Sequence, residues 1–203
     1  MKKYLMLILT GLLITGKVYC QKEIFFNEPS GKDKSLTIED ITRCLNGYEG
    51  DFIAIIEDDV VSIQRAAFEN NTKIKGLISD KLDWIQDNAF KGCSELKLVT
   101  LNSASTIGVN GFRDCKKLTT LNIPALHNGI GPNALNGCVN LKEMTILVER
   151  PPLIANNVFD GINKKKCKVF VVSEEAKANF LERAATTGKQ WDGFKFVVKK
   201  EKK

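Results

Sequence analysis

The chain has 203 residues, of which 43% are apolar and 27% charged, and its formal net charge is +6. This length suits one domain or a short run of repeats, and this composition excludes a disordered chain and a collagen-like rod. A single histidine, His127, excludes every metal site that needs two histidines. Few residues are therefore candidates for a catalytic site.

The positive charge is concentrated at the two ends of the chain. Residues 1–20 contain three lysines and no acid, and residues 199–203 contain four lysines and one glutamate. The body between them is near neutral. The net charge therefore gives no support for a nucleic-acid partner.

The first twenty residues have the pattern of an export signal. Two lysines follow the initiator methionine, and residues 4–14 form an apolar run. Such a run is typical of a signal peptide and is shorter than the roughly 20 apolar residues that cross a bilayer. We expect cleavage after Cys20, no transmembrane segment, and an exported protein that is secreted, periplasmic or on the cell surface.

Cys20 also permits a second interpretation, in which it is the lipidated first residue of a lipoprotein. The bulky Tyr19 before it disfavours this lipid anchor, because a lipobox carries small residues at that position. A mature chain that starts at Gln21 is the preferred expectation.

A helical cap is predicted before the repeats. Thr37 and Asp40 have the spacing of a capping box, and Ile38, Ile41 and Leu45 give one apolar face. The flank is expected to contain a flexible leader at 21–34, a helix at 37–46 and a strand at 52–56.

The centre of the chain repeats with a period of 22 to 23 residues. Phe68, Phe90, Phe112 and Leu135 lie 22, 22 and 23 residues apart. Three further columns keep these offsets: Ile63, Ile85, Ile107 and Ile130; Ile74, Leu96, Leu118 and Leu141; Leu77, Val99, Leu121 and Met144. Coils stacked at roughly 4.8 Å bury each column as a ladder that one coil alone cannot form. The pattern predicts a short α/β solenoid of four to five coils with parallel strands.

These repeats resemble the BspA-like leucine-rich repeat family. The unit from Ile85 to Leu101 reads I-x-x-x-A-F-x-x-C-x-x-L-x-x-V-x-L, and the resemblance covers about residues 59–172. It implies a leucine-rich-repeat fold with a helix at each end. It also implies a surface protein of a host-associated organism, with adhesion to host proteins or other cells as the expected role.

A cap of the kind common in this family is expected after the repeats. Ser173 is a suitable N-cap for a helix, and Trp191 is expected to pack into the cap. The predicted buried stripe of that helix is Ala176, Phe180, Leu181 and Ala184. The expected organisation is a signal peptide (1–20), a leader (21–34), an N-terminal cap (35–58), the repeats (59–168) and a C-terminal cap with a basic tail (169–203).

Five cysteines follow Cys20: Cys44, Cys93, Cys115, Cys138 and Cys167. The middle three are interpreted as buried and inert, and the disulfide state of the other two stays open. The middle three share one repeat column, which Asn71 and Ile162 occupy in the flanking coils. A column that accepts three kinds of side chain indicates a packing position. Disulfides between neighbouring coils remain an alternative, because stacking brings Cα atoms within bonding range.

The sequence predicts a binding protein without catalysis, cofactor or metal. Cys115 and His127 are not expected to pair, because one lies in an inward column and the other in a turn. An enzyme would depend on carboxylates such as Glu57, Asp58 and Asp59, which follow a strand where acids are common. We expect a protein or glycan ligand; the alternative is an accessory subunit of a cell-envelope complex.

The residues that face outward from the predicted strands are the candidate ligand contacts. Because Val99 and Leu101 point inward, Leu98 and Thr100 face solvent. Trp84 precedes a buried isoleucine and is also expected to be exposed, as an aromatic anchor. The predicted contacts are Ile78, Trp84, Leu98, Thr100, Thr120, Asn122, Glu143 and Thr145. The alternatives are that threonine and asparagine merely suit exposed strands and that Trp84 shields a turn.

Overall fold

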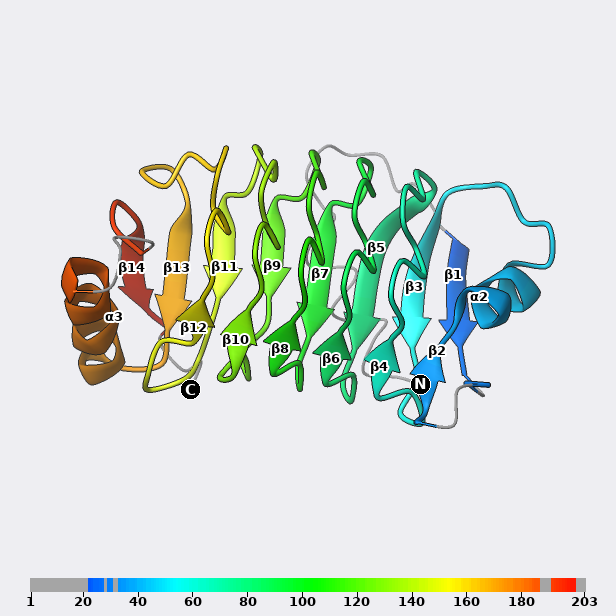
Figure 1. Cartoon of the computed structure of the whole chain (residues 1–203), viewed down its shortest axis with the longest axis horizontal. Helices are drawn as coiled ribbons and strands as arrows, with labels where there is room; N and C mark the ends of the chain where they lie inside the picture. The colour runs from blue at the N-terminus through cyan, green and yellow to red at the C-terminus, as the bar shows by residue number, and fades with distance from the viewer. Residues whose placement is uncertain (1–21, 28, 31–32, 187–190, 200–203) are drawn as a thin grey trace.

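From β1 to β13 the chain alternates between two parallel sheets, so that each turn of this part adds one strand to each sheet (Figure 1). The computed structural model describes residues 22–27, 29–30, 33–186 and 191–199, so the expected signal peptide, Cys20 and the end of the basic tail lie outside the described residues. The larger sheet has eight strands: β1 (Lys22–Phe26), β3 (Phe52–Ile56), β5 (Ile74–Ser79), β7 (Leu98–Leu101), β9 (Thr120–Asn122), β11 (Glu143–Thr145), β13 (Lys168–Val171) and β14 (Lys195–Val198).

The smaller sheet consists of two-residue strands on the other side of the core. Its members are β2 (Ser35–Leu36), β4 (Ser62–Ile63), β6 (Trp84–Ile85), β8 (Thr106–Ile107), β10 (Gly129–Ile130) and β12 (Leu153–Ile154). The predicted solenoid of parallel strands is confirmed. Its larger sheet is longer than four to five coils, because strands from both flanks extend it.

The predicted apolar columns form the core between the two sheets. The rings of Phe68 and Phe90 stack with centroids 5.0 Å apart, and those of Phe90 and Phe112 with centroids 5.2 Å apart. These separations are close to the spacing of parallel strands. Leu135 continues the column and is fully buried. Each coil therefore buries its apolar arc against the same arc of the next coil.

Left-handed residues shape the arcs opposite the larger sheet. Asn88, Asn110, Asn133 and Asn157 occupy one repeat position, with φ between 54° and 59°. Asparagine tolerates this backbone region better than most residues do. The N–H groups of the arc then bond to the next coil, as when the Asn88 N–H donates to the Val109 carbonyl at 2.8 Å.

The N-terminal end is closed by β1 and by α2 (Ile38–Leu45), which pack against each other. The capping box is confirmed: the Thr37 hydroxyl accepts from the Asp40 N–H at 3.1 Å, and the Asp40 carboxylate accepts from the Thr37 N–H at 3.0 Å. The expectation of a flexible leader is wrong for residues 22–26. Ile24 and Phe26 alternate into the core, so this segment pairs with β3.

The C-terminal end is closed by α3 (Glu174–Thr186), which packs against β13 and β14. The Ser173 hydroxyl accepts from the Ala176 N–H at 2.9 Å, as expected of an N-cap. Trp191 is buried with its ring centroid 5.0 Å from that of Phe180. Leu181 was predicted to be buried, but it is 50% exposed, because one residue along a helix turns the side chain by about 100°.

Candidate binding surface

The two predicted outward columns lie in register on the larger sheet. Backbone pairing aligns Gly76, Leu98, Thr120 and Glu143 in one column and Ile78, Thr100, Asn122 and Thr145 in the other. Side chains between them point into the core, as Val99 and Leu121 do. We call these two columns the outward face.

The middle of the outward face is open to solvent. Leu98, Thr100, Thr120 and Asn122 are half-buried, as a side chain standing on a sheet between two neighbours should be, and Glu143 is exposed. These five residues therefore satisfy the geometric requirement for ligand contact.

The exposure predicted for the two ends of the second column is wrong. Ile78 is 7% exposed, because it packs with Ile53 and Ile55 in a separate apolar cluster on the same side of the sheet. Thr145 is 9% exposed and lies between Asn122 and the larger Phe170. Neither side chain offers a ligand much surface.

Gly76 allows this apolar cluster to lie close to the sheet. A Cβ atom at Gly76 would come within 3.3 Å of Cγ2 of Ile53, tighter than most such contacts. The sequence does indicate this cluster, although the alternation of inward and outward residues does not. Phe52–Ile56 is an unbroken apolar run, which is typical of a strand buried on both faces.

Trp84 is 46% exposed, as predicted, but it lies apart from the outward face. It belongs to β6 in the smaller sheet, where it aligns with Ser62 and Thr106. The core separates the two sheets, so one small ligand cannot contact Trp84 and the outward columns together.

Comparison with known proteins identifies the repeats. The model of the BspA type leucine rich repeat region matches six copies over residues 53–168. The chain belongs to this family. Leucine-rich repeat proteins are generally non-enzymatic scaffolds that bind proteins, and BspA-type proteins are commonly secreted or surface proteins of bacteria.

One solved structure resembles the chain weakly. It is a leucine-rich repeat protein from Bacteroides ovatus with 20% sequence identity and a TM-score of 0.37, and the alignment covers 59% of this chain and 39% of that one. The chain thus spans about two fifths of that protein. The search of curated proteins gave no match.

The cysteine ladder of this BspA-type protein serves its core. The thiols of Cys93, Cys115 and Cys138 donate to the carbonyl oxygens of the preceding coil's Phe68, Phe90 and Phe112 at 3.0 to 3.2 Å. Cys93, Cys115, Cys138 and Cys167 are free thiols. Burial raises the pKa of Cys93 to about 12. The three thiols of the ladder are therefore buried, as the repeat column predicted, and the Cys93 thiol is poor in thiolate.

No catalytic arrangement forms around the other candidate residues. Cys115 is fully buried, whereas His127 is exposed with Nδ1 2.7 Å from the Ala125 carbonyl oxygen. Asp58 and Asp59 are exposed beyond the end of β3. Among the described residues, no three metal-ligating side chains lie close enough to hold an ion, and no helix is long and apolar enough to cross a bilayer.

Proposed function

We propose that this protein is an exported binding protein without catalytic activity, which holds a protein or glycan on the outward face in adhesion to a host or to other cells. The observation that carries the proposal is the in-register exposure of Leu98, Thr100, Thr120 and Asn122. These side chains present small polar and apolar groups at strand spacing, on a sheet whose inner side is fully packed.

The rigidity of the sheet favours binding. Thr100 and Asn122 each lie between two buried residues, on strands that are hydrogen-bonded on both sides, so they lose little freedom when a ligand orders them. A ligand that crosses several coils would meet equivalent positions at each one. Protein binding on such repeat surfaces is a general use of solenoids.

Export to the surface is supported by the pattern of residues 1–20 and by the usual location of BspA-type proteins. The mass of the mature N-terminus tests this part of the proposal. A chain that starts at Gln21 without acyl groups is expected, whereas an acylated Cys20 would place the protein on a membrane through a lipid anchor.

The binding face is tested with an array of host extracellular-matrix proteins and glycans. We expect the parent protein to bind at least one component, and the double variant Thr100→Arg with Asn122→Arg to lose that binding. Thermal unfolding of the variant should stay within a few degrees of the parent, because both positions are partly exposed. Absence of binding to every component would contradict an adhesive role.

A matched control locates the contact. Thr106→Arg introduces the same bulk and charge on a half-buried position of the smaller sheet, beside Trp84. It should leave binding unchanged. Loss of binding in Thr106→Arg or Trp84→Ala, with normal binding in the outward-face variant, would move the contact to the other side of the solenoid. Pull-down from the native envelope followed by mass spectrometry separates adhesion from the role of an accessory subunit.

A further inference from the structure

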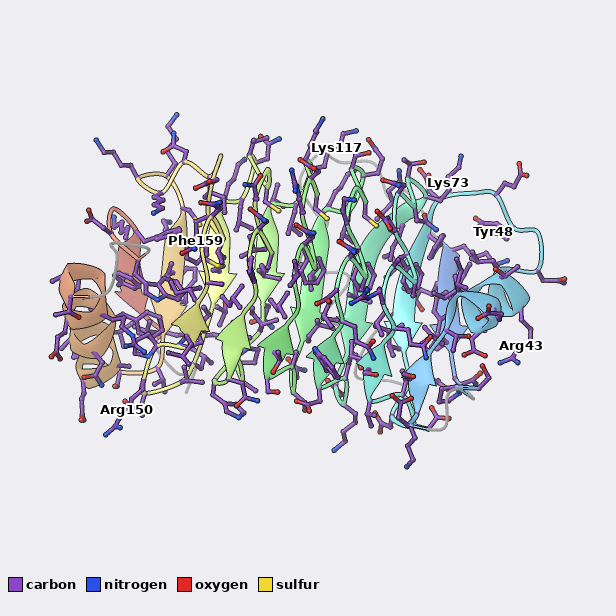
Figure 2. All side chains as sticks on the ribbon, in the orientation of Figure 1. Arg43, Tyr48, Lys73, Lys117, Arg150 and Phe159 are labelled. Atoms are coloured by element: carbon purple, nitrogen blue, oxygen red, sulfur yellow. The ribbon has the colours of Figure 1, made fainter. Side chains whose placement is uncertain are left out.

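Lysines line the edge of the solenoid where the strands of the larger sheet begin. Figure 2 shows Lys73 and Lys117 projecting from this edge and Arg150 from the opposite one. Lys75, Lys97, Thr119 and Lys142 occupy one position in successive coils, because the Lys97 N–H donates to the Lys75 carbonyl and this pairing continues through Thr119 to Lys142 at 2.9 to 3.0 Å.

A groove of about 230 Å³ opens at this edge. It is lined by Lys97, Lys117, Thr119, Asn140 and Lys142, which come from three successive coils. The Asn140 side chain is held by its bond to the Lys116 carbonyl at 2.8 Å, and the Thr119 hydroxyl donates to the Lys97 carbonyl at 3.1 Å. The hydroxyl oxygen and amide are fixed, while the three lysines supply the charge.

Acidic side chains neutralise only part of this charge. Glu95 forms ion pairs with Lys117 at 2.7 Å and with Lys75 at 3.2 Å, and hydrogen bonds from these two lysines lower the pKa of Glu95. Lys97 and Lys142 are exposed, and neither pairs with an acid in the part of the chain that the structure describes. The groove therefore keeps a positive charge on both of its sides.

The positive charge continues along the edge beyond the groove. The Lys168 N–H donates to the Lys142 carbonyl at 2.8 Å, which places Lys168 in the next coil, and the exposed Lys165 and Lys166 precede it. An acid lies beside this part of the row as well: Glu143 of the outward face is aligned with Lys168 on the neighbouring strand. The charges form a line that follows the coil spacing of roughly 4.8 Å, which suits an extended anion better than a compact one.

We propose that this edge binds a linear sulfated polysaccharide, with one sulfate between Lys97, Lys117 and Lys142 and the next along the row toward Lys168. Lysine suits sulfate as a flexible point charge. None of the described residues that line the groove is aromatic, so they do not offer the stacking that single-stranded nucleic acids use. The inference goes beyond the proposed function, because the residues that line this groove are not those of the two outward columns.

The test measures binding of a heparin decasaccharide to the purified protein by isothermal titration calorimetry. We expect binding that weakens as salt rises, and a loss of about tenfold or more in affinity for Lys97→Gln with Lys142→Gln. The same oligosaccharide without its sulfates should not bind. Both substitutions are at exposed positions, so the thermal unfolding temperature should stay within a few degrees of the parent.

Lys81→Gln with Arg150→Gln is the matched control. Lys81 is exposed just after the end of β5, and Arg150 is exposed at the opposite edge (Figure 2), so this variant removes two charges away from the groove. This variant should bind the decasaccharide within about twofold of the parent. Equal loss in both double variants, or no loss in the first, would overturn the proposal. So would binding to vesicles with one quarter phosphatidylglycerol that depends on Lys97 and Lys142 while the decasaccharide does not bind.

If the double variant fails to fold, Lys142→Gln alone is compared with Lys81→Gln, and the same difference is expected on a smaller scale. Failure of decasaccharide binding can be distinguished from failure of binding on the array. Thr100→Arg with Asn122→Arg leaves the lysines of this edge in place, so that variant should retain decasaccharide binding even where it loses its array ligand.

Discussion

Removal of one ring from the phenylalanine ladder should destabilise several coils at once. Phe90 is fully buried, and its ring stacks on Phe68 at 5.0 Å and on Phe112 at 5.2 Å, nearly parallel to both. Burial alone makes Phe→Ala cost about 3 to 5 kcal/mol, and each lost ring contact adds about 0.5 to 1.5 kcal/mol, partly counted in the first value. We therefore expect Phe90→Ala to lower the free energy of unfolding by about 4 to 6 kcal/mol.

Urea unfolding followed by circular dichroism measures this change. Typical domains have about 5 to 15 kcal/mol in total, so the midpoint should fall sharply or the chain should unfold without denaturant. Phe90→Leu should cost less than half as much, because Leu135 fills the same position of another coil. Phe25→Ala is the exposed control, at 44% exposure, and should cost under about 1 kcal/mol.

A loss below about 2 kcal/mol for Phe90→Ala would refute the reasoning, since it would mean that neighbouring coils close the cavity. A loss of similar size in Phe25→Ala would also refute it, because the effect would then not depend on position in the ladder.

Two further predictions concern titration and reactivity. Burial raises the pKa of Asp40, but hydrogen bonds from Thr37 and Ser30 outweigh this effect and leave the pKa at about 2. The Asp40 carboxylate should therefore stabilise the fold fully above pH 3.8 and lose this effect as pH falls toward 2. Asp40→Asn should remove that part of the pH dependence of stability in urea titrations, and an unchanged pH dependence would contradict the capping role. Burial raises the pKa values of Cys93 and Cys167 to about 12. Alkylation at pH 8, followed by peptide mass mapping, should therefore label the half-buried Cys44 well before these two residues. Equal labelling rates would contradict the burial of Cys93 and Cys167.

The repeated coils were predictable from the sequence because every repeat shows the same pattern of inward-facing residues. Each inward position, such as that of Phe90, recurs at a fixed offset, so register and burial follow from one another. The flanks lack this redundancy. In Lys22–Phe26 only Ile24 and Phe26 mark the core side, and the nearby Pro29 and Ser30 suggested a loop instead of a strand.

The outward face was harder to predict than the core. Its columns follow from alternation, yet the exposure of a position depends on the strand beside it. Ile78 is buried because β3 carries Ile53 and Ile55 on that side, which no property of its own repeat indicates. The basic groove was missed for a related reason: Lys97 and Lys142 lie 45 residues apart, and only the coil geometry brings them to one groove with Lys117.

The left-handed asparagine column has a consequence for how such a chain changes length. Because every arc turns at the same position and donates its N–H groups to the next arc, a duplicated unit would meet matching partners on both sides. Insertions of 22 or 23 residues between Asn88 and Asn133 would therefore lengthen the sheet without altering its cross-section. Insertions of other lengths would shift each later asparagine out of its turn, so length variation in this architecture should be quantised in whole coils.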